Sequence, residues 1–156
     1  MSRLLLMGVL MMLNASAWAD ITTSNDLNYH AICGQVNSLS PFVIAQIDRP
    51  PTITAVSVNP SVLWPPNSKM VNVTVDYTAT DDWGQPVCQI SNVTSNEQIR
   101  SSDYAILDAH HVKLRAERSG GGHGRVYTLA ISCTDGSGNS SSQTVTVTVP
   151  HDQGKK

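Results

Sequence analysis

Apolar and polar residues alternate with a period of two through most of the chain after Pro51. The alternation is clearest in 71–78 and 127–133, where every second residue is apolar or aromatic. Because successive side chains of a strand point to opposite faces, this period predicts half-buried strands. Seven such strands are expected, separated by turn residues, which is typical of an antiparallel sandwich. They cover 52–58, 71–78, 87–93, 104–107, 112–117, 127–133 and 145–149.

The first nineteen residues have the pattern of a secretory signal peptide. Arg3 provides the positive start, an apolar run follows to Leu13, and Ala17-Trp18-Ala19 has the small-x-small form that signal peptidase cleaves. The apolar run is too short for a membrane anchor, which needs about 20 residues. We therefore expect residues 1–19 to be removed and the protein to be secreted, periplasmic or extracellular, with no membrane span.

Residues 20–50 lack the alternation of the following segment. They predict a mostly irregular spacer with one strand near 40–45. Pro50 and Pro51 each fix φ and remove a backbone donor, so a domain boundary is expected there. The expected organisation is a signal peptide (1–19), the spacer (20–50), one β-domain (51–150) and a short tail (151–156).

Several short motifs in 51–153 resemble the immunoglobulin-like modules, including HYR-type repeats, of exported bacterial proteins. They read LWPPN at 63–67, ATDDWG at 79–84, LRAERSG at 114–120, CTDGSGN at 133–139 and VTVP at 147–150. The resemblance implies an all-β, seven-stranded antiparallel immunoglobulin-like sandwich. It also implies a non-catalytic spacer or adhesion role. Residues 34–45 resemble the last strand of a preceding β-domain, so a truncated relative of a longer protein is one interpretation.

Charge excludes one functional class. Twelve acidic and ten basic residues give a formal net charge of −2, and charged residues are only 14% of the chain. Proteins that bind nucleic acid normally show a positive stripe or patch, which this sequence lacks. No nucleic-acid partner is expected.

The three cysteines predict one disulfide and one free thiol. Thiols of exported proteins tend to be oxidised to structural bridges, and an odd number leaves one unpaired. Cys88 opens the third predicted strand and Cys133 ends the sixth, so in a sandwich both lie near the same tip of neighbouring strands. We expect them to pair, which leaves Cys33 in the spacer free to join a partner chain.

Motifs for catalysis are weak. There is no Gly-x-Ser-x-Gly elbow, and no opposed carboxylates of the glycosidase type are evident. Glu117 lies two residues from Arg115 on one strand face, where cross-strand charge pairing is the simpler interpretation. The glycine run at 120–124 leads into a strand rather than a helix, which indicates a hairpin and not a phosphate loop. No catalytic residue is expected.

Polar residues gather in the loops after the second and sixth predicted strands, which share one tip of a sandwich. Asp81, Asp82, Trp83, Asp135 and Asn139 therefore form a candidate contact tip. Asp and Asn commonly cap their own turns, and this interpretation is favoured, without a metal or cofactor. Calcium is the alternative, because it needs six to eight oxygen ligands and Asp48 could also approach the tip.

Two tryptophans bear on the choice of function. Trp83 at this tip and Trp64 at the other are expected to cap the core, although an exposed tryptophan could stack on a sugar. The leading hypothesis is a non-catalytic spacer, adhesion or protein-contact unit whose partners are other extracellular protein domains or cell-surface material. The alternative is a carbohydrate-binding module, and a small secreted hydrolase is a remote third.

Overall fold

The chain divides into two compact units, Met1–Asp48 and Arg49–Lys156. The computed structural model describes residues 8–14, 17–20, 22–26, 31–34, 42–46 and 48–152. Within these ranges the regular elements are β-strands and one short 3-10 helix. None of the described helical structure is long and apolar enough to cross a membrane.

The first unit contains strands where the sequence predicts a signal peptide and a spacer. β1 (Gly8–Asn14) lies in the predicted signal peptide, and β2 (Ala17–Asp20) ends one residue beyond it. Arg3 is outside the described residues. Removal of the signal peptide stays a prediction. β2, β1 and β5 (Phe42–Gln46) form one antiparallel sheet, and β3 (Thr22–Asp26) pairs with β4 (Ala31–Gly34). β5 matches the strand expected near 40–45, whereas β3 and β4 are further strands that the sequence did not predict. β3 reads TTSND, and a polar strand has no apolar alternation to reveal it.

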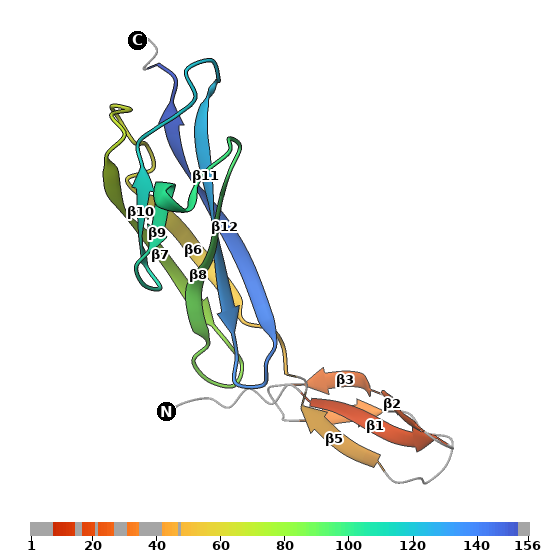
Figure 1. Cartoon of the computed structure of the whole chain (residues 1–156). Helices are drawn as coiled ribbons and strands as arrows, with labels where there is room; N and C mark the ends of the chain where they lie inside the picture. The colour runs from red at the N-terminus through yellow and green to blue at the C-terminus, as the bar shows by residue number, and fades with distance from the viewer. Residues whose placement is uncertain are drawn as a thin grey trace. The chain divides into compact units, whose positions relative to one another are not determined.

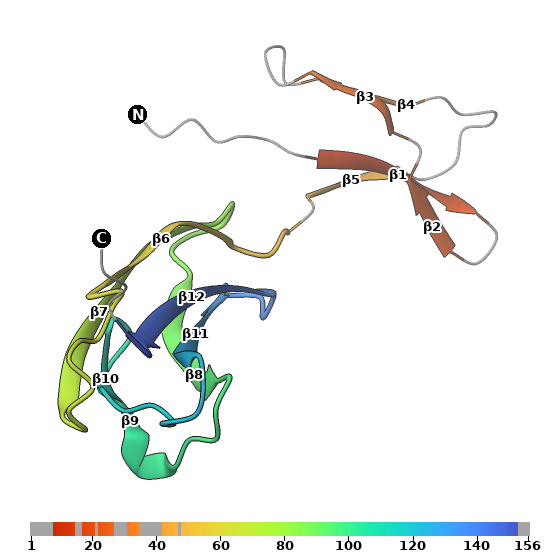
Figure 2. The same cartoon turned by 90° about the horizontal axis from the view of Figure 1, so that it is seen from above.

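The second unit consists of two antiparallel sheets that face each other, as Figure 2 shows. The four-stranded sheet has the order β6-β7-β10-β9 and the three-stranded sheet the order β12-β11-β8. This arrangement confirms the predicted all-β, sandwich-like architecture. The strands are β6 (Thr52–Asn59), β7 (Met70–Thr80), β8 (Val87–Ser95), β9 (Tyr104–Ile106), β10 (His111–Arg115), β11 (Gly124–Thr134) and β12 (Ser140–Pro150).

The core lies between the two sheets and follows from the alternation. β11 is the middle strand of its sheet, and its alternate residues Tyr127, Leu129, Ile131 and Cys133 are fully buried. They pack with the inward-facing residues of the other strands, because period two delivers one apolar side chain to the interior at every second position. Those partners include Val73, Val75, Val112, Leu114, Val147 and Val149.

The chain pairs with both sheets at the start of the second unit. β6 pairs with β7 in the four-stranded sheet. After β6, the Leu63 amide donates to the Thr148 carbonyl over 2.8 Å, and the Thr148 amide donates to the Ser61 carbonyl over 2.9 Å. Val62 thereby forms a parallel bridge to Thr148 of β12. Leu63, which ends this short parallel pairing, is buried in the core.

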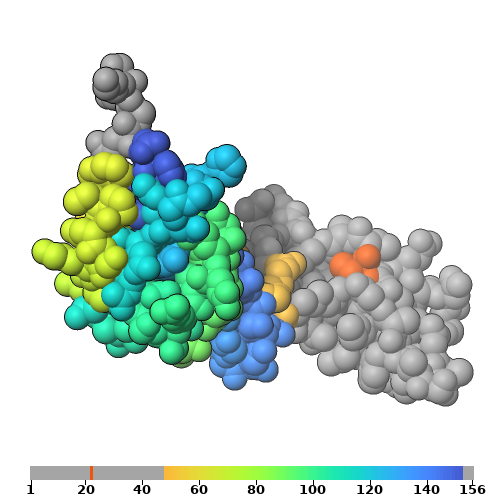
Figure 3. Space-filling model, turned by 45° about the horizontal axis from the view of Figure 1, so that its top comes forward, coloured from red at the N-terminus to blue at the C-terminus, as the bar shows by residue number. Residues whose placement is uncertain are grey.

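Two ends of the sandwich carry its connections (Figure 1). The β7–β8 and β11–β12 loops share the end at which β6 begins, because Thr52 pairs with Thr80 and Thr134 pairs with both Val87 and Ser140. We call this end the disulfide end. At the opposite end, the β8–β9 and β10–β11 connections lie on the face seen in Figure 3, in green and cyan.

Candidate functional site

The candidate contact tip lies at the disulfide end, and its aspartates cap their own turns. Asp81 accepts a hydrogen bond from the Trp83 amide over 3.0 Å and forms a short antiparallel bridge with Gly84. Asp135 accepts from the amides of Ser137 and Asn139 over 2.9 and 2.8 Å. These bonds are the side-chain-to-backbone pattern by which aspartate stabilises tight turns.

Asp135 is the most fully bonded carboxylate of the tip. Its second oxygen accepts from the Asn139 side-chain amide over 2.9 Å, and the Asp135 amide donates to the Asn139 carbonyl over 3.0 Å. Desolvation raises the pKa of Asp135, but the side chain and amide of Asn139 and the amides of Ser137 and Gly138 outweigh it, so the net pKa is lowered. The tip therefore holds this carboxylate in its charged form.

Two acidic oxygens come close together at the tip. One carboxylate oxygen of Asp81 lies within 4.8 Å of one of Asp135. Oδ1 of Asp81 has no hydrogen-bond partner among the described residues. Asp48, which the sequence also suggests for this end, belongs to the first unit. Asp82 instead pairs with Arg49 over 3.8 Å, with both side chains about half exposed, and such exposed pairs stabilise little.

The two loop tryptophans do not cap the core as predicted. Trp83 is 56% exposed and Trp64 is 44% exposed. The inward-facing residues of the strands fill the interior, and Leu63, rather than its neighbour Trp64, enters it. Both indole rings are consequently available to a ligand, at opposite ends of the sandwich.

The predicted disulfide joins Cys88 and Cys133. The two residues lie directly opposite each other in the β8–β11 register, so the bridge links neighbouring strands of one sheet. Cys133 is fully buried and Cys88 is half-buried. Cys33 lies in β4, and its side chain is outside what the structure describes, so its free thiol stays a prediction.

A second polar cluster, at the opposite end, is built on Asp103. This residue closes the 3-10 helix η1 (Ser101–Asp103) and is only 8% exposed. One of its oxygens accepts from the Arg100 amide over 3.0 Å, and the other accepts from Nε of Arg115 over 3.0 Å. Arg115 also donates to the carbonyls of Ser102 and Ser68 over 2.8 and 2.9 Å. The guanidinium of Arg115 therefore fixes the connection to the sheet.

Arg125 is the buried cation of this cluster. Its side chain is 7% exposed and pairs with Glu97 over 3.1 Å and with Asp103 over 3.7 Å. Nη1 of Arg125 donates to the Tyr127 hydroxyl over 3.1 Å, and that hydroxyl donates to the Arg115 carbonyl over 2.9 Å. Buried charges persist only when they are paired and hydrogen-bonded, and both conditions are met here.

The electrostatics of the cluster favour the charged forms. Burial raises the pKa of Asp103, but the Arg100 amide and the guanidinium groups of Arg115 and Arg125 outweigh it and lower the net pKa. Burial lowers the pKa of Arg125, whereas Tyr127 and Glu97 raise it above its ordinary value. Burial raises the pKa of Tyr127, which therefore stays protonated and able to donate. At neutral pH the cluster is therefore a network of ion pairs.

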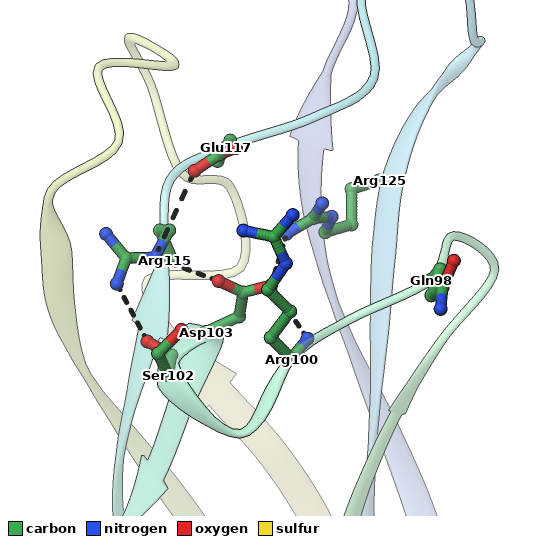
Figure 4. A pocket seen from close by; sticks show the side chains of 7 residues that line it. All are labelled: Gln98, Arg100, Ser102, Asp103, Arg115, Glu117 and Arg125. Atoms are coloured by element: carbon green, nitrogen blue, oxygen red, sulfur yellow. Dashed lines mark hydrogen bonds and ion pairs between the residues drawn. The ribbon is translucent and has the colours of Figure 1, made fainter.

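A cavity of about 440 Å³ opens above this cluster (Figure 4). The β8–β9 connection supplies Gln98, Arg100, Ser102 and Asp103 to its lining. The end of β10 supplies Arg115, the segment after it supplies Glu117, and the start of β11 supplies Arg125. The lining contains no histidine, cysteine or aromatic residue. The groups that it offers are guanidinium donors, carboxylates, one amide and one hydroxyl, which suit binding by charge and hydrogen bonds.

Sequence reasoning found only one element of this cavity. Charge pairing of Glu117 is present, but its partner is Arg115, two positions away in the same segment, at 4.0 Å and not across strands. The buried role of Arg125 was missed, although it has a signal in the sequence. Arg125 stands two positions before Tyr127, on the inward-facing side of the same strand. A cation at a core-facing position predicts buried carboxylate partners, here Glu97 and Asp103.

No protein-family model matches the chain, and neither the curated proteins nor the solved structures include a significant match to it. Functional inference therefore depends on the fold and on the geometry of the two ends.

Proposed function

We propose that the chain is an exported, non-catalytic immunoglobulin-like module that acts as a spacer, adhesion or protein-contact unit. The observation that carries the proposal is the strand order of the second unit. In chain order, β6 to β12 correspond to strands A to G. The sheets β6-β7-β10-β9 and β12-β11-β8 then have the ABED and GFC orders of the constant-type immunoglobulin sandwich.

Two further observations support the proposal. Residues 61–63 leave the four-stranded sheet and pair with β12, so the leading segment contacts both sheets. The Cys88–Cys133 disulfide suits an oxidising compartment outside the cytoplasm. It differs from the antibody bridge, which joins strands B and F across the two sheets, because it joins neighbouring strands of one sheet.

Carbohydrate binding is the second candidate because Trp83 and Trp64 are exposed. The two rings stand at opposite ends of the sandwich and form no aromatic row, so each would have to bind a sugar alone. A protein-contact role needs no such row. This difference ranks the contact unit first.

The test is a set of pull-downs with the whole chain against cellulose, chitin, peptidoglycan and an immobilised cell-surface protein fraction. The proposal expects retention by the protein fraction and none by the polysaccharides. Retention by a polysaccharide that Trp83→Ala or Trp64→Ala abolishes would replace it with carbohydrate binding. Turnover in a broad hydrolase screen, persisting after repurification, would overturn the non-catalytic assignment.

A further inference from the structure

We propose that the cavity above Asp103 binds the carboxylate of an aspartate or glutamate side chain on an extended segment of a partner protein. We call this cavity the Arg100 pocket, lined by Gln98, Arg100, Ser102, Asp103, Arg115, Glu117 and Arg125. The inference deepens the proposed function and rests on it, because it names the chemistry by which a contact unit would hold its partner.

The lining of the pocket carries a net positive charge. Three arginines line the pocket, and two of them are paired within the protein. Arg115 pairs with Asp103 and Glu117, and Arg125 pairs with Glu97 and Asp103. Arg100 is exposed and forms no ion pair with any described residue. The lining alone, three guanidinium groups and the carboxylates of Asp103 and Glu117, carries a net charge of +1. Glu97, which balances that charge, pairs with Arg125 and lies outside the lining. A monoanion in the pocket can therefore pair with Arg100, the guanidinium group that no described carboxylate pairs.

The pocket lining contains guanidinium donors that no described group uses. Arg100 and Arg125 both line the cavity, and Figure 4 labels the two side chains among its walls. Arg125 uses Nε for Glu97 and Nη1 for Tyr127, and its Nη2 has no hydrogen-bond partner in the described part of the chain. Guanidinium groups bind carboxylates with short, charge-assisted hydrogen bonds. Two guanidinium groups with free donors in the lining of one cavity therefore offer a binding site for a carboxylate.

The floor of the pocket is held by buried ion pairs, and its rim is exposed. Asp103 and Arg125, at the floor, are 8% and 6% exposed. Arg115 holds the β8–β9 connection in place by donating a hydrogen bond to the Ser102 carbonyl. A site whose floor is already ordered loses less conformational entropy when it binds. The exposed rim residues remain accessible from solvent.

The pocket chemistry selects a carboxylate on a peptide over other anions. A phosphate monoester carries about −1.5 to −2 charges at neutral pH, which exceeds the net charge of +1 that the lining residues carry. A sugar acid would find no aromatic face, because none of the lining residues is aromatic. The side chains of Gln98 and Ser102 have no hydrogen-bond partner among the described residues and can bond the amides and carbonyls of an extended backbone.

The experiment is an NMR titration of the whole chain with the blocked tripeptide acetyl-Gly-Asp-Gly-amide at low salt. The Asn peptide, sodium acetate and inorganic phosphate are the comparison ligands. The Asp peptide should shift the resonances of Gln98, Arg100 and Ser102, and the Asn peptide should bind about tenfold more weakly. Arg100→Gln should raise the Kd of the Asp peptide about tenfold, the loss expected for one charge-assisted hydrogen bond. Lys113→Gln removes one exposed positive charge outside the pocket and should leave the Kd unchanged.

Several outcomes would overturn the inference. They are an absence of shifts at the pocket, equal affinity for the Asp and Asn peptides, or equal Kd values for Arg100→Gln and Lys113→Gln. Tighter binding of phosphate, or acetate binding as tight as the peptide, would contradict the charge or the peptide argument respectively. If the protein fraction retains the chain while the pocket binds no peptide, only this inference fails. If polysaccharide retains the chain through a tryptophan, the proposed function fails whatever the titration shows.

Discussion

Removing the disulfide tests the energetics of the sandwich most directly. The Cys88–Cys133 bridge closes a loop of 45 residues, which includes the β8–β9 connection, β9, β10 and most of β11. In the chain-entropy treatment a loop of that length restricts the unfolded chain enough to stabilise the native state by about 4 kcal/mol. Cys133 is fully buried, so its replacement by alanine adds roughly 1 kcal/mol for the lost sulfur contacts.

The perturbation is the double variant Cys88→Ala/Cys133→Ala, compared with wild type in a Cys33→Ser background that prevents thiol exchange. Urea unfolding followed by far-ultraviolet circular dichroism should show a loss of about 4–5 kcal/mol. That is a large part of the roughly 5–15 kcal/mol of a typical domain. The m-value should also rise, because the unfolded chain without the bridge exposes more surface.

Reductant provides the matched control. Reducing the wild-type bridge should reproduce most of the loss, and the same reductant should leave the double variant unchanged. A loss below about 1 kcal/mol would refute the reasoning. It would mean that the unfolded chain already holds β8 and β11 together, or that the oxidised bridge does not form in solution.

Two further predictions concern the opposite end. The net pKa of Asp103 is lowered in the folded state, so its contribution to stability is complete above its unfolded pKa of about 3.9 and is lost as pH falls through the lower folded value. Asp103→Asn should lower the free energy of unfolding by about 1–3 kcal/mol at pH 7, and this difference from wild type should shrink in urea melts below about pH 4. The exposed control Asp76→Asn should match wild type at every pH. A difference between wild type and Asp103→Asn that does not change with pH would contradict the lowered pKa of Asp103. Gly124 has φ +105°, and a Cβ there would lie 2.8 Å from a backbone carbonyl oxygen, so Gly124→Ala should cost roughly 1–3 kcal/mol. Gly120→Ala, which meets no atom within 4 Å, should change stability by less than about 0.5 kcal/mol, and similar losses for both would remove the steric explanation.

The sandwich could be predicted because its strands bury one face each. β7, and β11 from Arg125 on, alternate between buried and less buried residues. The same alternation of apolar and polar residues is present in the sequence. Polar strands of the first unit, such as β3, have no such pattern and were missed. The path after β6 was missed too, because pairing of residues 61–63 with β12 depends on contacts more than eighty residues away.

The contacts at one end of the sandwich could be predicted from the sequence, and those at the other end could not. The turn caps at Asp81 and Asp135 are local, since their partners lie within four residues. The Arg100 pocket depends on ion pairs across 12 and 28 positions of sequence. Sequence alone does not give the distance between such groups. The exposure of Trp83 was equally unpredictable, because a large apolar residue in a loop can turn inward or outward with little change in local pattern.

The parallel pairing of residues 61–63 with Thr148 has a mechanical consequence. In the second unit, β6 comes first in the chain and β12 comes last. Opposing tension on the two ends of the unit therefore pulls the segment that leads through residues 61–63 and the strand β12 along their own axes. The hydrogen bonds between Leu63, Ser61 and Thr148 lie across that direction. Tension must therefore load them together in shear rather than open them one after another. A unit held in this way can carry a tensile load along its strands while its core stays closed.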